Sequence, residues 1–454
     1  MSQHSAVHKT SSTKLARIEV KSRMDKGCVF NNLGHIIDLD LLRECYRSLD
    51  GSKAVGIDGV SKEAYGRNDE ENLTDLLDRI RKGVYVPRPS RVVEIPKVDG
   101  TTRPLAIACV EDKIVQEACK RILERIYEPL FLPESFGFRP GRNPHKALVA
   151  LNGHLMSGKN GAVVDVDLRR AFDTIPHGHL EEMLRRKISD ARFLHLLLKL
   201  IRAETVGEDR VPRKSTCGVP QGSILSPLLC NVFLHFVIDE WFREYNSLRL
   251  GGRGSLTRYA DDLVMTAPDV TAARRLHDEL AKRVRSYGMS LHDGKTRVIP
   301  NGQIAAKHAS VRGTRLPAFT FLGFLHVWGK SRNRRTGKEF WRVKLRTCPK
   351  RFRAKLLAIK EHVRRNRHSK DLLARMRAVV QGYLNYFSIN DNTDRVSAFV
   401  QIVRRILFKW LRRRSQKQVL TWERFAEILK LASFPNPKLL HNLFFTTSAF
   451  KTQC

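Results

Sequence analysis

Two adjacent acidic residues, Asp261 and Asp262, lie inside an otherwise largely apolar run at 256–267, which reads L-T-R-Y-A-D-D-L-V-M-T-A. Neighbouring carboxylates are costly to bury, and they repel one another unless a cation lies between them. A small residue and two acids between strand-like flanks predict a β-hairpin whose turn presents the carboxylates. Such a turn is either a metal site or an ordinary exposed Asp-Asp turn, and the pair by itself favours the ordinary turn.

A second acidic segment lies upstream at 161–176 and reads G-A-V-V-D-V-D-L-R-R-A-F-D-T-I-P. Its β-branched residues predict a strand that runs into a polar, helical turn. Asp165, Asp167 and Asp173 are its candidates for the same site. Asp165 and Asp167 share one face of the strand because side chains alternate with a period of two, so the sequence leaves both open. Carboxylate oxygens suit Mg²⁺, which takes one or two carboxylates and shares the rest of its shell with substrate phosphates.

These two segments and a third resemble the motifs of reverse transcriptases. Asp167, followed by Phe172 and Asp173, is similar to the first catalytic motif, and the tetrad that ends at Asp262 is similar to the second. The segment 217–234 reads C-G-V-P-Q-G-S-I-L-S-P-L-L-C-N-V-F-L. It contains the Pro-Gln-Gly tripeptide of the same family, which we expect to open a helix.

The resemblance implies a polymerase site with two metal ions. Asp167, Asp261 and Asp262 would bind two Mg²⁺ ions, with Mn²⁺ as a substitute, about 3.5–4 Å apart for in-line nucleotidyl transfer. Phe172 would stack beneath the deoxyribose and exclude a 2′-hydroxyl, although an aromatic ring at this place also suits the core. Gln221 would contact a nucleotide or the template strand.

Three basic residues, two on a predicted hairpin and one late in the polymerase segment, are predicted by resemblance to belong to this site. The segment 91–105, R-V-V-E-I-P-K-V-D-G-T-T-R-P-L, predicts two strands around an Asp-Gly turn. Lys97 and Arg103 lie on either side of the turn, where two cations can hold a triphosphate. The segment looks like the fingers motif of bacterial group II intron reverse transcriptases, in which the matching residues face the incoming nucleotide. Lys295 matches the late-palm lysine of the family, as a proton donor or a phosphate contact, with a solvated lysine as the alternative.

Two segments that combine aromatic residues with glycine indicate contacts with nucleic acid. S-F-G-F-R-P-G-R at 135–142 resembles a further block of the family and suits backbone contact and base stacking through Arg139 and Arg142. F-T-F-L-G-F at 319–324 resembles the primer-grip block. Gly323 in that block would let the backbone and a primer approach each other closely.

The charge of the chain predicts a polyanionic partner. The sequence has 82 Lys and Arg against 46 Asp and Glu, a net charge of +36. Residues 331–454 hold 30 basic and 7 acidic residues, a net of +23, which leaves +13 for the first 330. From Pro349 onward, three segments with an apolar stripe opposite Arg and Lys predict a helical thumb with a phosphate-facing side. The middle one contains G-Y-L-N-Y-F at 382–387 and looks like the thumb/maturase (X) domain of group II intron proteins. The candidate phosphate contacts in the third segment are Arg404, Arg405, Arg412 and Arg413, with Arg414 beside them.

Compartment signals are sparse. The eight cysteines form no C-x-x-C pair, which indicates buried or free thiols in a reducing cytoplasm, where we expect association with ribonucleoprotein or nucleoid. No apolar run approaches the roughly 18 residues needed to span a bilayer, so no membrane partner is expected. The polar residues 1–25 are expected to form a flexible basic arm. The sequence up to Cys454 contains no Cys/His-rich segment of an HNH endonuclease, so we expect the compact type that lacks this domain.

The expected fold class is α+β. The resemblance implies a right-hand polymerase, with fingers and a palm that carries an antiparallel sheet, followed by an all-α thumb/maturase domain. The expected divisions are an arm at 1–25, fingers and palm at 26–328, the thumb/maturase domain at 329–430, and a short tail at 431–454 for which DNA binding is open.

The function implied by the resemblance is RNA-directed DNA polymerisation by a group II intron-encoded protein that also assists intron splicing. Its expected partners are group II intron RNA, an RNA template with a DNA primer, dNTPs and target DNA. Two alternatives come from other classes of protein. An RNA-binding splicing cofactor with a vestigial polymerase is disfavoured by the intact acids. A domesticated polymerase for anti-phage defence or DNA repair, with no intron partner, is not rejected by the sequence.

Overall fold

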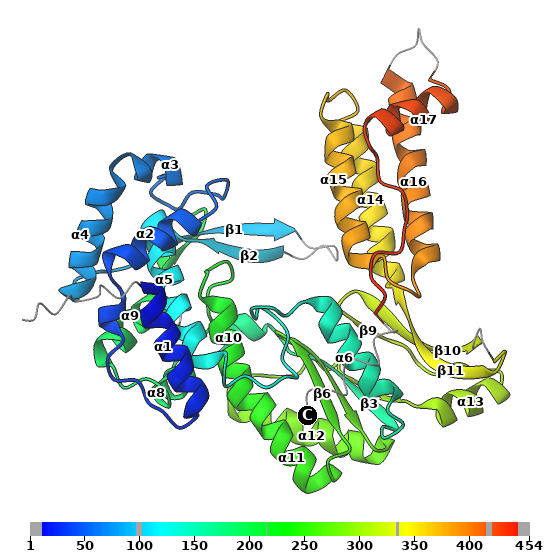
Figure 1. Cartoon of the computed structure of the whole chain (residues 1–454), viewed down its shortest axis with the longest axis horizontal. Helices are drawn as coiled ribbons and strands as arrows, with labels where there is room; N and C mark the ends of the chain where they lie inside the picture. Colours follow the sequence, from blue (N-terminus) through cyan, green and yellow to red (C-terminus); the bar gives the residue numbers. More distant parts are fainter. Residues whose placement is uncertain (1–10, 97–101, 215, 333–335, 415–419, 444–454) are drawn as a thin grey trace, which may run out of the picture. The chain divides into compact units, whose positions relative to one another are not determined.

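The computed structural model describes residues 11–96, 102–214, 216–332, 336–414 and 420–443. The chain forms two compact units, one made of 1–147 and 164–298 and the other of 148–163 and 299–454. Both units contain helices and strands (Figure 1), which confirms the expected mixture of α and β structure.

The first unit begins with helices packed around the buried helix α5 (Val110–Tyr127). Apolar residues recur along α5 with helical spacing, and its residues Val115, Ile122 and Ile126 are fully buried. Helices α1 and α2 pack directly on α5. The other elements here are α1 (Ser11–Met24), η1 (Gly34–Ile36), α2 (Leu39–Ser48), α3 (Lys62–Tyr65), η2 (Gly66–Asn68) and α4 (Asp69–Arg81).

Helix α1 replaces the flexible arm expected for residues 1–25. Leu15 and Ile18 are buried, and the Ser22 hydroxyl donates a hydrogen bond of 2.6 Å to the Ile126 carbonyl. The prediction was wrong for residues 11–24 because these three residues form a narrow buried stripe, at spacings of three and four, in an otherwise polar segment.

A hairpin of β1 (Ser90–Pro96) and β2 (Thr102–Ile107) confirms the two strands expected at 91–105. The strands are antiparallel, and Arg91 pairs with Ile107. The expected Asp-Gly turn and Lys97 fall outside the described residues. The sheet has the order β2-β1-β4-β5 and is completed by β4 (Thr205–Val206) and β5 (Pro212–Arg213).

The next segment forms two helices, α8 (His177–Arg185) and α9 (Ala191–Ile201). Between them, the backbone of Ser189 donates to the Phe30 carbonyl at 2.8 Å. Asp190 then caps α9 by accepting a hydrogen bond from the Phe193 amide at 3.0 Å. The break between the two helices therefore lies at a contact with a residue that is distant in sequence.

The second sheet has the strand order β6-β7-β3-β8. Its central strand β7 is buried on both faces after its first residue, and helix α12 packs against it. Helices α10 and α11 form one run that contains the π-helical turn η3. The elements are β3 (Ala162–Asp167), α7 (Ala171–Thr174), α10 (Ser226–Leu234), η3 (His235–Asp239), α11 (Glu240–Leu250), β6 (Ser255–Tyr259), β7 (Asp262–Ala267), α12 (Val270–Ser286) and β8 (Arg297–Pro300).

The second unit contains an antiparallel sheet of order β11-β10-β9. Its strands are β9 (Phe319–Phe321), β10 (Phe324–Arg332) and β11 (Glu339–Thr347), beside α13 (Gln303–Val311) and most of α6 (Pro144–Met156). The all-α domain expected from residue 329 is therefore wrong for 329–347. Val343, Leu345 and Thr347 alternate inward with the period of a strand, a pattern that the high charge of the segment obscured.

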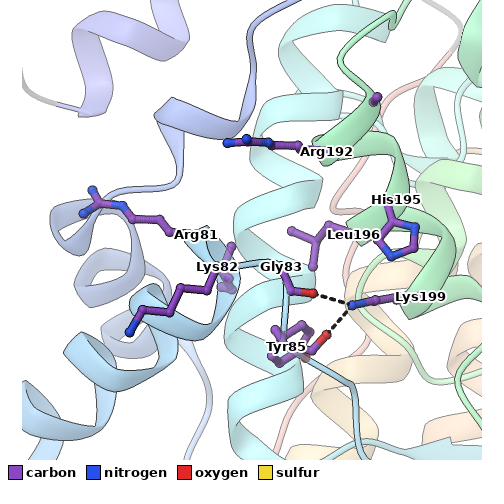
Figure 2. Close-up of a pocket in the computed structure, with 10 residues that line it drawn as sticks. Arg81, Lys82, Gly83, Tyr85, Arg192, His195, Leu196 and Lys199 are labelled. Carbon is purple, nitrogen blue, oxygen red and sulfur yellow. Dashed lines mark hydrogen bonds between the residues drawn. The ribbon is translucent and has the colours of Figure 1, made fainter.

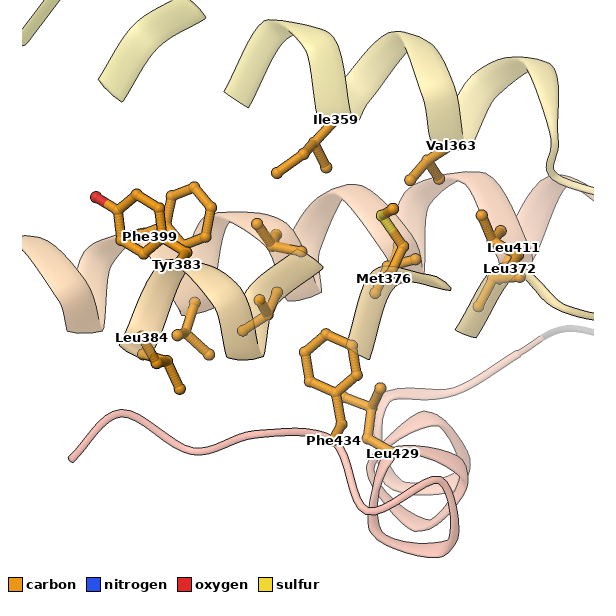
Figure 3. Packing of buried hydrophobic residues seen from close by; sticks show 14 of the residues in the cluster. Ile359, Val363, Leu372, Met376, Tyr383, Leu384, Phe399, Leu411, Leu429 and Phe434 are labelled. Atoms are coloured by element: carbon orange, nitrogen blue, oxygen red, sulfur yellow. The ribbon is translucent and has the colours of Figure 1, made fainter. Parts of the chain in front are cut away.

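Helices α14 (Pro349–Arg365), α15 (Leu372–Phe387) and α16 (Thr393–Leu411) confirm the three helices expected beyond Pro349. Figure 3 shows Ile359 and Val363 of α14 in the same apolar core as Phe399 of α16. The ring of Trp422 in α17 (Trp422–Leu431) stacks on Phe408 with centroids 4.1 Å apart. The short turn η4 (Arg412–Arg414) follows α16.

No helix in the described parts of the chain combines the length and the apolar character needed to cross a membrane. The cysteines in these parts are free thiols, and Cys45, Cys119 and Cys230 are buried. Burial raises the pKa of the Cys45 thiol to about 12, so this residue stays protonated and packs as a small apolar side chain.

Candidate active site

The acidic tetrad forms the tight turn of the β6–β7 hairpin. Tyr259 pairs with Asp262, so Ala260 and Asp261 are the two residues of the loop. Ala260 is buried and has a φ of 57°, a left-handed conformation that L-residues rarely adopt and that two-residue hairpin loops require. The turn expected from the sequence is therefore present, and it places Asp261 at the end of the sheet.

The neighbouring strand β3 separates its two candidate carboxylates. Asp165 forms an ion pair with Arg297 at 3.1 Å, and burial raises the pKa of Asp165 while Arg297 lowers it. Asp167 ends the strand, lies 3.6 Å from the Lys295 ammonium and is 42% exposed. Because Arg297 already pairs with Asp165, the more exposed Asp167 is the better candidate for a metal ligand.

Asp261 is electrostatically coupled to two other segments of the first unit. Burial raises the pKa of the Asp261 carboxyl, the Arg103 guanidinium lowers it, and the charge of Asp167 raises it again. Asp167 and Arg103 therefore lie close enough to act on the turn. A partly buried carboxylate beside a second carboxylate gains most from a cation placed between the two.

A divalent cation suits the donors in this carboxylate pair. Asp167 and Asp261 supply hard oxygen ligands, and Mg²⁺ commonly takes one or two carboxylates together with substrate phosphates. Among the residues that the structure describes, no group of three or more His, Cys, Asp or Glu side chains could hold a metal ion. Asp262 begins β7, so the expected trio of Asp167, Asp261 and Asp262 does not form a three-residue metal site. Asp167 and Asp261 would instead share an ion with phosphate oxygens.

Gln221 joins Arg103 to Asp173. Its amide oxygen accepts a hydrogen bond from Arg103 Nε, and its amide nitrogen donates to Asp173 Oδ1 at 2.7 Å. The Gln221 carbonyl also accepts a bond of 2.6 Å from the Ala106 amide in β2. At Gly222, φ is 108° and a built Cβ would lie 2.4 Å from the Ala106 carbonyl oxygen, so a larger residue does not fit there. Gln221 thus lies before α10 and connects β2 with α7.

Phe172 is a buried residue of α7 directly before Asp173. Its carbonyl accepts a hydrogen bond of 2.8 Å from the Val219 amide, which ties α7 to the loop that carries Gln221. The side chain is 9% exposed. This burial agrees with a core residue and with a ring beneath a bound sugar, so the steric gate stays a prediction.

One residue of the site was not singled out from the sequence. Arg258 precedes the tetrad, is fully buried, and donates to the Ala260 carbonyl at 3.1 Å. The sequence signal that could have identified Arg258 is its position as a cation inside a largely apolar strand, because a buried charge requires a partner. That partner is Asp239, 19 residues upstream, and sequence spacing does not identify it.

Two family models match the sequence. One, described as Reverse transcriptase (RNA-dependent DNA polymerase), matches residues 95–325, just over half of the chain. This chain belongs to the reverse transcriptase family. The other model, described as Group II intron, maturase-specific domain, matches residues 349–426 and spans α14, α15 and α16.

Curated relatives of this chain include proteins named for introns. Group II intron-encoded protein LtrA of Lactococcus lactis subsp. cremoris is 34% identical over 223 residues, 49% of this chain and 37% of LtrA. Protein YkfC of Escherichia coli (strain K12) is 38% identical over 200 residues, 43% of this chain and 52% of YkfC. The "Uncharacterized 91 kDa protein in cob intron" of Schizosaccharomyces pombe is 33% identical over 265 residues, 57% of this chain and 32% of that protein. The chain thus spans between about a third and a half of the length of these relatives.

Within the reverse transcriptase segment, the two arginines of the 135–142 block have different environments. Arg139 is 7% exposed, forms an ion pair with Glu128 at 2.8 Å, and donates to two carbonyls of the preceding loop. These partners occupy its guanidinium, so we withdraw the nucleic-acid contact predicted for Arg139. Arg142 is half-buried and lies over the Phe136 ring, 5.3 Å from its centroid. Its nucleic-acid contact stays a prediction.

The segment 319–324, for which a primer grip was predicted, forms another tight hairpin, in the second unit. Phe321 pairs with Phe324, and the loop residues Leu322 and Gly323 have φ values of 49° and 80°. A Cβ built at Gly323 would lie 3.1 Å from Arg351 Nη1 of α14, so the structure shows a close approach of a helix at this glycine. Contact between Gly323 and a primer remains a prediction.

The four predicted phosphate-binding arginines of the helical bundle differ in exposure. Arg405, Arg412 and Arg413 are exposed. Arg404 instead donates to Asn436 Oδ1 at 2.7 Å, and burial lowers the pKa of its guanidinium. Arg404 therefore fastens the segment that follows α17, and the three exposed residues remain the candidates for phosphate contact.

A basic hollow in the first unit was not predicted. It measures about 430 Å³ and lies between the end of α4 and the start of α9 (Figure 2). Its basic lining residues are Arg81, Lys82, Arg192, His195 and Lys199. Lys199 donates to the carbonyls of Gly83 and Tyr85 at 2.9 Å each and so closes the end of α4. Arg81, Lys82 and Arg192 are exposed and, within the described parts of the chain, form no ion pair.

Proposed function

We propose that this chain is an RNA-directed DNA polymerase encoded by a group II intron, which copies intron RNA into cDNA and assists splicing. The observation that carries the proposal is the position of Asp261 on the β6–β7 turn at the end of the second sheet, where the charges of Asp167 and Arg103 act on its carboxyl. Membership of the reverse transcriptase family supports the polymerase activity. The maturase-specific match at 349–426 and the relative named group II intron-encoded protein support the intron assignment.

The proposal includes the right-hand arrangement of such polymerases. Fingers would comprise residues 30–160 and 178–216, the palm 161–177 and 217–328, and the thumb the helices that follow. The β1–β2 hairpin would then belong to the fingers, and the hairpin that carries Asp261 would belong to the palm.

The reaction forms a bond between the primer 3′-oxygen and the α-phosphorus of a dNTP and breaks the bond to the leaving pyrophosphate. Asp167 and Asp261 would hold Mg²⁺ together with the triphosphate oxygens, and Asp262 would support them. When bound, the ions would activate the 3′-hydroxyl and stabilise the negative charge that develops on the leaving group. Family members generally use divalent ions for this purpose, which agrees with the donor set.

Other side chains would orient the nucleotide and control its charge. Arg103 would contact the triphosphate, and Gln221 would hold the Arg103 guanidinium in place by accepting from its Nε. Lys295, which lies 3.6 Å from Asp167, would donate a proton to the leaving pyrophosphate or bind its oxygens. Lys97 would add a second contact with the triphosphate, and Phe172 would pack beneath the sugar.

The proposed RNA partner is supported by basic surfaces in both units. The exposed residues Arg405, Arg412 and Arg413 lie in the strongly basic C-terminal part of the chain, which has a net charge of +23 over residues 331–454. The hollow beside α4 adds exposed cations in the first unit. Exposed cations of this kind favour phosphate backbones, since their binding releases condensed counterions. Intron RNA, a template with its primer and target DNA all present such backbones.

Primer extension by the purified chain tests the polymerase proposal. The parent protein should extend a DNA primer annealed to an RNA template in the presence of Mg²⁺ and dNTPs. Asp261→Asn and Asp167→Asn should each lower the rate by about 1,000-fold or more, because loss of a metal ligand removes several kcal/mol of transition-state stabilisation.

Asp165→Asn is the matched control for that experiment. It removes a carboxylate from the same strand, but one that is already paired with Arg297. We expect this variant to retain the parent rate within about threefold, as for a substitution outside the reacting groups. If Asp261→Asn extends primers like the parent, the site assignment is wrong. If the parent itself fails, the chain is a binding protein.

A second assay separates the intron-encoded protein from a domesticated polymerase. The parent should bind its own intron RNA more tightly than an unrelated structured RNA of equal length, and it should raise the splicing rate of that intron. Asp261→Asn should keep both properties because the splicing chemistry belongs to the RNA. Equal affinity for both RNAs across a salt titration, with intact primer extension, would favour the domesticated polymerase.

A further inference from the structure

A buried ion pair lies next to the acidic turn. Arg258 in β6 and Asp239 in η3 both have fully buried side chains and form a two-pronged ion pair, with N–O distances of 2.7 and 2.6 Å. Burial raises the pKa of Asp239, Arg258 lowers it, and the net shift is downward. An ion pair of this kind holds its shape firmly because both charges would be costly to leave unpaired.

Asn231 extends this pair to a second part of the first unit. Its side-chain oxygen accepts a bond of 2.9 Å from Arg258 Nη1, and its nitrogen donates to the Gly137 carbonyl at 2.7 Å. Gly137 packs against the turn so closely that a built Cβ would lie 2.4 Å from the Ala260 nitrogen. The segment around Gly137 also pairs with β6, where the Phe136 amide donates to the Arg258 carbonyl at 2.8 Å.

The same guanidinium nitrogen that contacts Asn231 also donates to the Ala260 carbonyl at 3.1 Å. The Ala260 carbonyl and the Asp261 amide belong to one planar peptide group. Fixing the direction of this carbonyl therefore fixes the peptide plane from which the Asp261 side chain departs. Ala260 needs such support because its φ of 57° is unfavourable for an alanine.

We propose that Arg258 is a positioning residue for DNA synthesis: held by Asp239 and Asn231, it sets the orientation of the peptide that carries Asp261. It acts through the Ala260 carbonyl and touches no reacting atom. The π-helical turn η3 places Asp239 opposite Arg258, and π-helical insertions of this kind often occur at functional sites. The inference rests on the proposed function, since it assigns a role within polymerisation.

Arg258→Lys provides the main test in the full-length protein. Lysine keeps the charge opposite Asp239 but lacks the planar set of donors that reaches Asp239, Asn231 and the Ala260 carbonyl together. We expect the single-turnover extension rate to fall about 100-fold, as for a misplacement of about 1 Å, with the KM for dNTP within about threefold of the parent. We also expect the Mg²⁺ concentration that gives half of the Mg²⁺-induced rise in Tm to increase by about 10-fold, which measures the carboxylates without relying on activity.

Arg283→Lys is the matched control. Arg283 is a partly buried arginine of α12 that donates to the carbonyls of Val237 and Phe236 in the same π-helical turn, and neither of these hydrogen bonds involves the acidic turn. We expect this variant to keep the parent rate and the parent Mg²⁺ response. Equal losses in Arg258→Lys and Arg283→Lys would show a general packing effect and overturn the proposal. A parent-like rate and Mg²⁺ response in Arg258→Lys would do the same.

A milder variant covers the case in which Arg258→Lys does not fold. Asn231→Ser removes the amide that links Arg258 to Gly137 and leaves the ion pair with Asp239 intact. We expect its rate to fall about 10-fold, in line with the loss of one hydrogen bond to a charged group, with an unchanged KM for dNTP. A folded Asn231→Ser protein with the parent rate overturns the proposal. A parent that extends no primer refutes the proposed function instead, so the two failures are distinguishable.

Discussion

The phenol of Tyr85 donates a hydrogen bond of 2.5 Å to the buried carboxylate of Asp112. The second carboxylate oxygen of Asp112 accepts a bond of 3.2 Å from the Arg88 amide. Asp112 thereby joins helix α5 to the segment that leads from α4 into β1. Burial raises the pKa of Asp112 from 3.8 to about 6, although both hydrogen bonds lower it.

This raised pKa predicts a pH-dependent stability. Between pH 4 and 6 the folded protein binds the Asp112 proton more tightly than the unfolded chain, so stability falls as the pH rises through 6. The full difference between 3.8 and about 6 corresponds to about 3 kcal/mol. The unfolding free energy of the parent minus that of Asp112→Asn should therefore decrease across this range and level off above it. Urea unfolding of both proteins at several pH values measures this difference, and a flat difference would contradict the assignment.

Loss of the Gln221 side chain should weaken nucleotide binding. In Gln221→Ala, Arg103 loses the acceptor that orients its guanidinium, and Asp173 loses a donor. We expect the KM for dNTP to rise about 10-fold or more, since a hydrogen bond to a charged group contributes about 1.5–3 kcal/mol. Gln381→Ala is a suitable control because Gln381 is exposed and its side-chain amide donates to Asn385 in the second unit. An unchanged KM in a folded Gln221→Ala protein would remove Gln221 from the nucleotide site.

Phe172→Val should relax the choice between dNTPs and ribonucleotides. If the ring fills the space of a 2′-hydroxyl, shortening it should lower the ratio of kcat/KM for dNTP over rNTP by about 10-fold or more. Phe193→Val is the control, because Phe193 is a buried ring of a different helix, α9. Both variants lose packing, so only a change in selectivity that is specific to Phe172→Val supports the gate. Unchanged selectivity in an active protein would make Phe172 a core residue.

The exposed arginines of the helical bundle should govern the salt dependence of RNA binding. Replacing Arg405, Arg412 and Arg413 together by Gln should reduce the slope of log K against log salt concentration by about two to three, since each lost phosphate contact removes roughly one. Affinity titrations from low to high salt measure this slope. Arg404 is left unchanged because it fastens the segment at Asn436.

The control for this triple variant replaces three arginines that are already ion-paired on the first unit, namely Arg43, Arg185 and Arg213. It removes the same charge, so a general loss of long-range attraction would affect both proteins equally. An equal slope change in both would show that the bundle is not a specific phosphate-binding surface. A further variant, Arg81→Gln with Arg192→Gln, tests whether the hollow beside α4 adds its own contacts.

Short-range patterns predicted much of this structure. The strand–turn–strand pattern in 91–105, the two acids at 261 and 262, and the apolar stripes beyond Pro349 each identified the correct type of element, since these patterns depend on neighbouring residues. The choice between Asp165 and Asp167 required the position of Arg297, which no pattern within the strand provides.

The remaining features depend on residues that meet only after folding. Arg139 looks like a nucleic-acid contact in sequence, but Glu128 lies beside it in space. The role inferred for Arg258 depends on Asp239 and Asn231, two residues of a helical run whose π-helical turn has no sequence signature. Residues 11–24 became helical because α5 supplies the apolar surface that their narrow stripe needs.

The coupled carboxylates lie in the first unit, whereas the helices of the maturase-specific match lie in the second. On the proposed function, one base change in the Asp261 codon abolishes DNA synthesis and alters no residue of α14, α15 or α16. DNA synthesis and splicing assistance would therefore be separable heritable traits of one gene. A lineage that inherits this chain can lose the first by point mutation while selection continues to preserve the second.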